Sequence, residues 1–465
     1  MTGHTRRVRT RKTRRSLLSL IVVAVCSVVS YTSVSPVVPL SAQQPPDEAT
    51  RLLMEYVRID TSNPPGDTRK AADWLAAIFA REGIPATRYE SAPGKAIIYA
   101  RLKATVTPPA GKTIVLLHHM DVVPADRSRW KTDPFVPTIQ GGDLWGRGSL
   151  DMKSMGVAEI IAFLRLKREH VPLDRDVILL AEPDEEVGGA TGARWMLANH
   201  FAELDPEYMI DEGGFGSRDL FAPDKLVYGI SVAEKKLIWL KVRAEGVAGH
   251  GSQPNDQNPN DRLMKALGRM LAEPMPAGDF AVLKTMQARV GTFAANKFTN
   301  AIQRSTIAVT WIRSGVGDPP KQNVIPSVAE AGLDCRVLPG TTREQWLAEV
   351  KRRLGDPALK IEVVNEGDDA PITTTDSPLY KIIEAAIKRR HPDATVTPIV
   401  IPYTTDSNAF RPKGVKSYGI FPAILPAAVV GQMHGDAERV PLDGVREAAE
   451  VFFEVVRGAG ETSKK

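Results

Sequence analysis

Three apolar runs of strand length, each continued by a group of polar residues, constrain the fold of this chain more than any other feature. The runs with their continuations are TIVLL-HHMD (113–121), DVILLA-EPDEE (176–186) and YMI-DEGG (208–214). Between the first two, the apolar residues of segment 157–164 have the spacing of one helix face. Strands that alternate with helices predict a parallel sheet, and such sheets bind ligands beyond the carboxyl ends of their strands. The sequence therefore predicts an α/β domain with a functional site at that edge.

The pattern changes after about residue 235, where the expected elements follow the order βαββαβ of a ferredoxin-like unit. The expected strands are 237–243, 306–312, 331–338 and 359–364, and the expected helices are 261–271 and 343–354. A capping box formed by Thr341 and Glu344 is expected at the start of the second helix. Because the earlier pattern resumes near Leu379, we expect one domain made of residues 47–234 and 366–460, with a second domain, 235–365, inserted into it.

Residues 1–42 have the pattern of a targeting segment. They hold seven basic side chains and no acidic one, and the apolar run Leu17–Val29 follows the basic part. An apolar run of this length is typical of a signal peptide, whereas a membrane span needs about 20 residues. Cleavage after Ala42 and retention as an N-terminal membrane anchor both stay open. Either alternative predicts export to the periplasm or secretion.

The charge balance argues against nucleic acid as a partner. Of the 60 Lys and Arg residues, seven lie in segment 1–42, which leaves 53 against 55 Asp and Glu. The rest of the chain therefore has no basic excess that could follow a phosphate backbone. The two cysteines are Cys26 and Cys335, and one of them lies in the targeting segment. The folded part is thus expected to contain neither a disulfide nor a cysteine zinc site.

Four of the eight histidines lie in turns rich in glycine or acidic residues. They are His118, His119, His250 and His434. Imidazole and carboxylate together are the ligands that zinc and similar divalent metals prefer. The motifs that hold them, or that add carboxylates, are LLHHMDVVPAD, LWGRGSLDMKSMG, AEPDEEVGG, MIDEGG, GVAGHGSQP, NVIPSVAEAGLDCR and QMHGDAERVP.

With these motifs the chain resembles the di-zinc aminoacylase and carboxypeptidase family, which includes glutamate carboxypeptidase and succinyl-diaminopimelate desuccinylase. The resemblance covers about residues 47–460. It implies a zinc-exopeptidase catalytic domain with a mostly parallel sheet, and an inserted α+β lid domain that can also mediate a homodimer.

The resemblance also implies two zinc ions per chain, for which cobalt or manganese can substitute. His119 and Asp211 would hold one ion, Glu186 and His434 the other, and Asp151 would bridge both. In the family the peptide after the bridging aspartate is often cis, which is the expectation for Asp151–Met152.

Two further residues beside these ligands receive roles from the resemblance. Glu185 would be the general base, and Asp121 would accept a hydrogen bond from the second imidazole nitrogen of His119 and so orient it. His118 stands where the family more often has glycine, and we expect it to be structural.

Substrate contacts are expected from the inserted domain. By resemblance, His250 would stabilise the oxyanion, in some relatives across a dimer interface, while Asn323 and Arg336 would hold the substrate carboxylate. His250 as an ordinary loop histidine and Arg336 in a structural ion pair remain alternatives.

The resemblance implies a metal-dependent hydrolase that cleaves an amide next to a free carboxylate, in a small peptide or an N-acyl amino acid. A biosynthetic deacylase of the desuccinylase or deacetylase type is an alternative. A binding or receptor homologue without activity and a solute-binding protein are alternatives of a different class.

Overall fold

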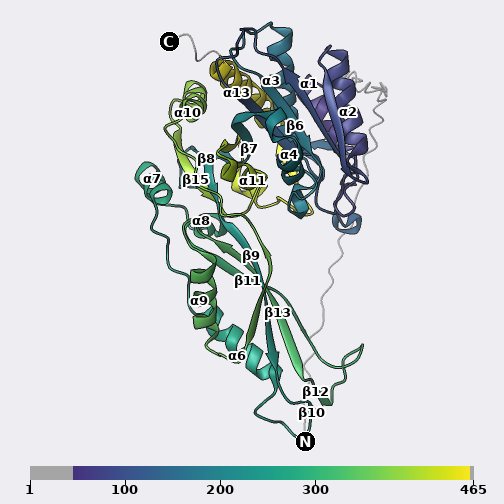
Figure 1. Cartoon of the computed structure of the whole chain (residues 1–465), viewed down its shortest axis with the longest axis vertical. Coiled ribbons are helices and arrows are strands. Elements are labelled where there is room, and N and C mark those ends of the chain that lie inside the picture. Colours follow the sequence, from purple (N-terminus) through teal and green to yellow (C-terminus); the bar gives the residue numbers. More distant parts are fainter. Residues whose placement is uncertain (1–45, 461–465) are drawn as a thin grey trace, which may run out of the picture. The chain divides into compact units, whose positions relative to one another are not determined.

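The computed structural model describes residues 46–460, which form one compact unit. The expected targeting segment, residues 1–42, lies outside the described residues. Within residues 46–460, no helix is long and apolar enough to cross a membrane. The described chain forms an eight-stranded sheet and a four-stranded sheet, together with two smaller ones (Figure 1).

The eight-stranded sheet is parallel at its centre, as the sequence predicts. Strands β6, β3, β7 and β16 run parallel to one another. Strands β1 and β2 are antiparallel additions at one edge, and β8 pairs antiparallel with β16 and parallel with β15 toward the other edge. In spatial order the strands are β1 (Ala86–Ala92), β2 (Lys95–Leu102), β6 (Val177–Glu182), β3 (Thr113–His119), β7 (Pro206–Ser217), β16 (Lys416–Ile424), β8 (Val227–Glu234) and β15 (Thr395–Ile401).

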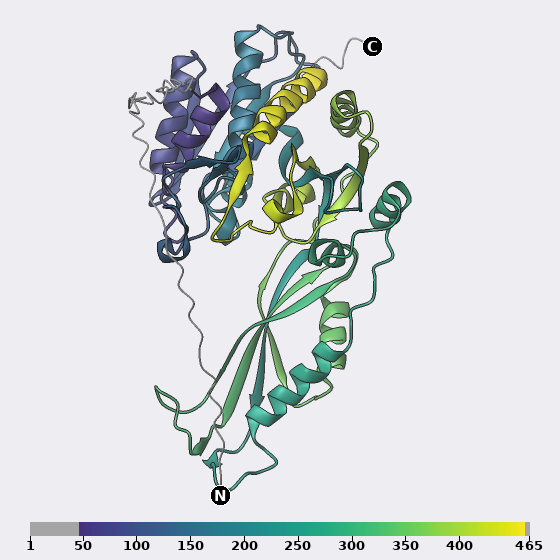
Figure 2. The same cartoon turned by 180° about the vertical axis from the view of Figure 1, so that it is seen from behind.

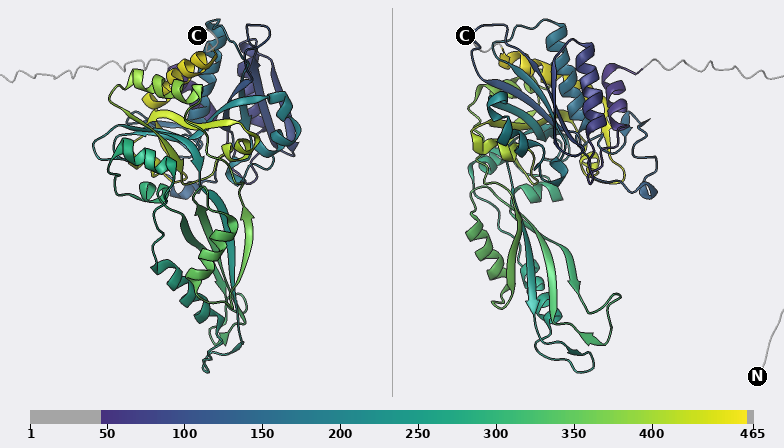
Figure 3. Two further views of the ribbon diagram at one scale, coloured as in Figure 1. Left: turned by 60° about the vertical axis from the view of Figure 1, so that its left-hand side comes forward. Right: turned by 45° about the vertical axis from the view of Figure 1, so that its right-hand side comes forward.

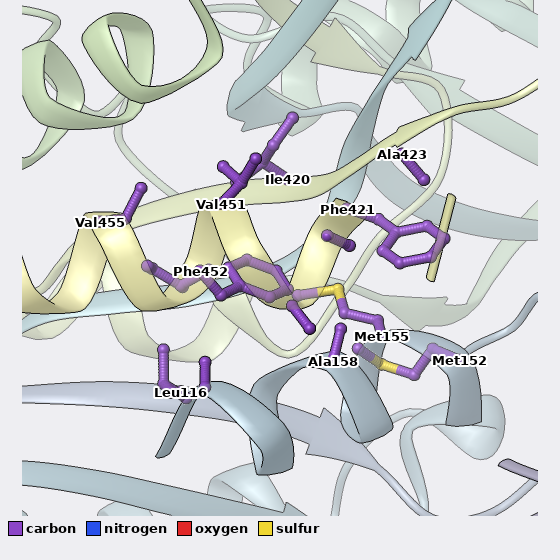
Figure 4. Close-up of a cluster of buried hydrophobic side chains, with 14 of the residues drawn as sticks. Leu116, Met152, Met155, Ala158, Ile420, Phe421, Ala423, Val451, Phe452 and Val455 are labelled. Atoms are coloured by element: carbon purple, nitrogen blue, oxygen red, sulfur yellow. The ribbon is translucent and has the colours of Figure 1, made fainter. Parts of the chain in front are cut away.

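Helices cover both faces of this sheet (Figures 1 and 3). On one face Leu116 of β3 and Ile420 of β16 pack against Met155, Val451 and Phe452 (Figure 4). The helices in this layer are α1 (Glu48–Val57), α2 (Arg69–Arg81), α3 (Lys153–Arg168), α10 (Pro378–Arg390) and α13 (Leu442–Gly460). The opposite face carries a smaller core with α4 (Ala193–Asn199), α5 (Phe201–Leu204) and α11 (Ser407–Phe410). Burial on both faces explains why the central strands are continuous apolar runs.

The four-stranded sheet is antiparallel and buries one face. Its strands in spatial order are β11 (Thr306–Ser314), β13 (Val328–Val337), β9 (Lys236–Glu245) and β14 (Lys360–Glu366). Alternate residues of β9 and β13 pack against α6 (Pro259–Ala272) and α9 (Arg343–Leu354). The elements thus follow the expected βαββαβ order. The capping box at α9 is formed one residue later than expected, by Thr342 and Gln345.

One segment between α6 and β11 packs on the larger sheet. Helix α7 (Ala281–Val290) contacts β15, and Val282, Met286 and Val290 belong to the core of the eight-stranded sheet. These three residues are spaced four apart, so they form one apolar face that covers the edge strand β15. Helix α8 (Lys297–Ile302) follows it. The division of the chain at residues 235 and 366 stays a prediction. This segment belongs to the expected inserted domain by sequence but packs on the sheet of the other domain.

Candidate metal centre

Most of the expected metal ligands, together with Glu185, lie where the central strands end. His119 is the last residue of β3, Glu185 and Glu186 follow β6, and Asp151 lies two residues before the start of α3. His434 approaches from the loop that precedes the short strand β17 (Arg439–Pro441). The expectation that the functional residues gather at one edge of the sheet agrees with this arrangement.

Asp151 lies between two histidines. Its Oδ1 is 3.1 Å from His119 Nε2, and its Oδ2 is 3.0 Å from His434 Nε2. Glu212 Oε1 is 3.8 Å from His119 Nε2, and Glu186 Oε2 is 3.3 Å from His434 Nε2. We call His119, Asp151 and Glu212 the inner group, and Asp151, Glu186 and His434 the outer group. In each group, one potential ligand atom from every residue lies within 4.8 Å of the others.

The two groups differ in exposure. The His119 side chain is 1 % exposed, whereas that of His434 is 48 % exposed. His434 also has a positive φ of 62°, which turns the backbone of its loop sharply. The outer group therefore faces solvent, which is the side from which a substrate can reach the site.

Asp121 contacts the second imidazole nitrogen of His119 through its backbone carbonyl, whereas the sequence predicts a hydrogen bond to its carboxylate. His119 Nδ1 is 2.9 Å from the Asp121 carbonyl oxygen and 3.5 Å from Asp121 Oδ1. Asn63 Nδ2 donates to the other Asp121 oxygen at 2.8 Å. These contacts place the proton on Nδ1 and leave Nε2 as the nitrogen that faces Asp151.

From the DEGG segment, the structure places Glu212 in the inner group, and not Asp211, the residue that the resemblance implies. Asp211 Oδ2 accepts hydrogen bonds from the Ser407 backbone N–H and hydroxyl at 2.9 and 2.8 Å, on the side of α11. Asp211 Oδ1 accepts from the Glu212 backbone N–H. Successive side chains of a strand point to opposite faces. Since Asp211 points to α11, its neighbour Glu212 points to the two histidines.

Burial and like charge raise the pKa values of three glutamates in the centre. Burial alone would also raise the pKa of Asp151, but its hydrogen bonds with His119 and His434 lower it. Burial raises the pKa of Glu212, and the Asp151 carboxylate raises it further. Burial and Glu212 raise the pKa of Glu185, while burial and Asp151 raise that of Glu186. Burial alone would lower the pKa of His434, but its hydrogen bonds with Asp151 and Glu186 raise it to about 11. Several carboxylates therefore compete for positive charge in one small volume.

The residues present fit two divalent cations. Asp151, Glu185, Glu186 and Glu212 would together carry four negative charges, which two such cations balance. Glu186 Oε1 is buried without a hydrogen-bond partner, as expected for a ligand atom that points at a cation. Imidazole nitrogens and carboxylate oxygens suit zinc, cobalt and manganese.

His118 points away from the centre. It is fully buried, and its Nδ1 is 3.2 Å from Glu159 Oε2 on α3. A Cβ at Gly156 would lie 2.6 Å from the His118 ring, so the glycine provides the space for this imidazole. The structure thus gives His118 a packing position beneath the site. The Asp151–Met152 peptide is cis, as predicted.

The residues expected to contact substrate lie apart from the centre. His250 and Asn323 are at the strands β10 (Gly249–His250) and β12 (Val324–Ile325), at the end of the four-stranded sheet far from the larger sheet (Figures 1 and 2). His250 is exposed, and its Nδ1 is 2.7 Å from Ser252 Oγ. Arg336 donates to both carboxylate oxygens of Asp334, at 2.8 and 3.2 Å. In this conformation Arg336 therefore forms the structural ion pair that the sequence analysis gave as the alternative.

Comparison with known proteins shows which family the sequence matches. The model of peptidase family M20/M25/M40 matches residues 115–458. The human N-fatty-acyl-amino acid synthase/hydrolase PM20D1 is 28 % identical over 76 % of this chain and 75 % of its own length. Aminoacylase-1 of Dictyostelium discoideum is 26 % identical over 81 % of this chain and 89 % of its own.

Solved structures show the same fold. A crystal structure of the M20 family metallo-carboxypeptidase Sso-CP2 from Sulfolobus solfataricus covers 89 % of this chain and 99 % of its own, with a TM-score of 0.67 and 19 % identity. A dinuclear metal-binding M20 peptidase from Bacillus subtilis matches with a TM-score of 0.57 and 13 % identity, over 89 % of this chain and 98 % of its own.

The adjacent acids Asp211 and Glu212 can be separated by mutation. Glu212→Gln removes a charged ligand, so we expect it to weaken zinc binding by at least about tenfold. Asp211→Asn should leave zinc binding unchanged but lower the free energy of unfolding by about 1–3 kcal/mol, because its buried hydrogen bonds to Ser407 lose their charge. Zinc titration by calorimetry and urea unfolding measure the two effects. If Asp211→Asn loses zinc while Glu212→Gln binds it normally, Asp211 is the ligand, as the resemblance implies.

Proposed function

The chain belongs to peptidase family M20/M25/M40 and is a metal-dependent hydrolase, and on this premise we propose that it uses two zinc ions to cleave an amide bond beside a free carboxylate. The observation that carries the proposal is Asp151, whose two oxygens face the histidines of two separate groups. A carboxylate in this position can bridge two cations.

The proposed substrates are small peptides and N-acyl amino acids. Support comes from relatives named as aminoacylase, as N-fatty-acyl-amino acid synthase/hydrolase and, in Dictyostelium discoideum, as a probable carboxypeptidase S-like protein. An N-acyl amino acid and a peptide with a free C-terminus share one feature, a carboxylate on the carbon that carries the amide nitrogen. Recognition of this carboxylate is the part of the proposal that distinguishes an exopeptidase from an endopeptidase.

In the proposed reaction Glu185 moves the proton. Two divalent cations in the centre would polarise the scissile carbonyl and lower the pKa of a water molecule. Glu185 takes a proton from the attacking water, and it later gives that proton to the leaving amide nitrogen. Its place in the chain supports this role, because Glu185 directly precedes Glu186 of the outer group in the turn after β6 and belongs to neither group. Burial and the Glu212 carboxylate raise its pKa, which suits a group that must hold a proton.

The first test separates the base from its neighbour. Glu185→Gln should keep both zinc ions and lower kcat by about 10²–10⁴-fold, because a carboxamide cannot accept the proton. Glu186→Gln, in the adjacent position, should instead weaken zinc binding in the outer group. The measurements are zinc content and kcat for an N-acyl amino acid. Equal zinc loss in both variants would refute the division of roles.

Arg336 is proposed to read the substrate carboxylate. The proposal is supported by the contact of its guanidinium with both oxygens of Asp334, because the same fork of donors fits a substrate carboxylate. Substrate binding would then require Arg336 to exchange Asp334 for the substrate, with Asn323 as the second proposed contact.

A cycle of kcat/KM values tests this role of Arg336. Wild type and Arg336→Ala are each measured with the acid and the amide form of one substrate. The loss should be about 2–5 kcal/mol for the acid and much smaller for the amide, which has no carboxylate to bind. Asp334→Ala is the matched control, since it frees Arg336 and should not weaken the acid form. Equal losses on acid and amide would show that Arg336 only supports the fold.

A second copy of the chain is proposed to bring His250 to the site. Strand β11 lies at the edge of the four-stranded sheet and exposes Trp311 (44 %) and Ile312 (60 %). An exposed edge strand with apolar side chains favours pairing with another chain. Because His250 lies far from the centre of its own chain, a partner subunit is the source that would supply it.

Complementation between two inactive variants tests this sharing. A mixed dimer of Glu185→Gln and His250→Ala has one site with both residues intact, so random exchange should restore about a quarter of the wild-type activity. Adding Ile312→Lys to both chains should abolish the recovery and give monomers in light scattering. Dimers that exchange subunits without any recovered activity would exclude a partner's His250.

A further inference from the structure

A buried ion pair joins the loops that carry Asp151 and His434. The two loops adjoin the strands β5 (Asp143–Trp145) and β17, which pair antiparallel with Val440 opposite Leu144. Strand β4 (Thr138–Gln140) completes this small sheet. The pairing brings segment 146–151 next to segment 434–438, although almost 300 residues separate them in the sequence. The pairing of β5 with β17 aligns only these strands, so other contacts must hold the adjoining loops in place.

Glu438 holds the loop of the bridging carboxylate. Its side chain is 0 % exposed, and its Oε1 accepts hydrogen bonds from the backbone N–H groups of Leu150 (2.9 Å) and Asp151 (3.2 Å). Its Oε2 pairs with Arg147 Nη1. Because the carboxylate binds the backbone of Asp151 itself, it determines where the Asp151 side chain starts.

Arg147 holds the other loop. It is 2 % exposed, and its Nη2 donates to the His434 backbone carbonyl at 3.2 Å. Its guanidinium lies over the Trp130 ring, 5.3 Å from the ring centre. The planar guanidinium thus binds Glu438 with one nitrogen and His434 with another. Through these contacts, one ion pair touches the backbone of both Asp151 and His434.

The energetics of burial favour a geometric role for this pair. Burying two charges costs desolvation that their attraction only partly offsets, and apolar residues of similar volume often replace a buried pair without loss of stability. Stability alone therefore does not explain why Arg147 and Glu438 are buried here. Their burial is explained by four contacts, which join the two residues to each other and to the two loops.

We propose that Arg147 and Glu438 are positioning residues that set the separation of Asp151 and His434 and thereby the affinity of the outer group for its cation. The proposal rests on the proposed function, in which the outer group binds a metal. Neither residue touches that cation; both act through the backbone of its ligands.

The test uses the full chain, zinc and two kinds of variant. Arg147→Lys keeps the charge but loses the fork, so the weaker of the two zinc-binding steps should lose about 10–100-fold in affinity. The double variant Arg147→Met/Glu438→Leu removes both charges together and should remain folded, yet it should show the same loss. Calorimetric zinc titration gives the two affinities, and the visible spectrum of the cobalt-loaded protein reports the coordination of the second ion.

Two reference variants make the outcome specific. His434→Ala removes a ligand of the outer group and identifies which binding step belongs to it. Arg353→Lys alters an equally buried arginine, whose partner Glu349 on α9 is 32 % exposed, and should leave both zinc affinities unchanged. A folded double variant, or a folded Arg147→Lys, that binds both zinc ions like the wild type would overturn the proposal. If the wild type itself binds fewer than two ions, the proposed function fails instead.

Discussion

The shared carboxylate of Asp151 is the interaction on which the rest of the site depends. Its two oxygens lie 3.1 and 3.0 Å from the Nε2 atoms of His119 and His434, which come from β3 and from a loop near the end of the chain. Such a contact needs both histidines and the aspartate to be placed independently. The parallel sheet places His119, the start of α3 places Asp151, and the β5–β17 pairing brings in the loop of His434.

Concentrating acids in this way is costly without cations. Burial raises the pKa values of Glu185, Glu186 and Glu212, and neighbouring carboxylates raise them further. A cation that binds the folded chain and not the unfolded one adds stability that grows with its concentration, about 2.7 kcal/mol at 100 times its Kd. In the proposed enzyme, metal binding and folding stability are therefore linked, and the same charges that destabilise the metal-free site are the ligands.

The sequence was informative about strands and less so about the direction of side chains. Apolar runs that end in polar groups predicted the central strands and the edge where the site forms, because burial on both faces leaves a clear pattern. The same pattern cannot tell which of two adjacent acids points inward. Alternation places Asp211 and Glu212 on opposite faces of the strand, but only the contact of Asp211 with Ser407 shows which face each one takes.

Contacts made through tertiary structure were also beyond the sequence. Helix α7 lies in the middle of the expected inserted domain, yet Met286 packs into the core of the larger sheet, since the edge strand β15 offers the apolar surface. Arg147 stands in GRGSLDMK and Glu438 in MHGDAE, but only the folded chain shows that they form one buried pair. The expected substrate contacts were inferred from motifs that resemble the family, namely those of His250, Asn323 and Arg336. Their proposed roles need a second chain or a movement of the four-stranded sheet.

The most direct test of the bridged centre is a crystal structure of the zinc-loaded protein with anomalous data collected at the zinc absorption edge. The bridging arrangement predicts two anomalous peaks about 3.5–4 Å apart, one on each oxygen of Asp151. His119 and Glu212 should bind the first ion, and Glu186 and His434 the second. A single peak, or two peaks of which only one contacts Asp151, would contradict it.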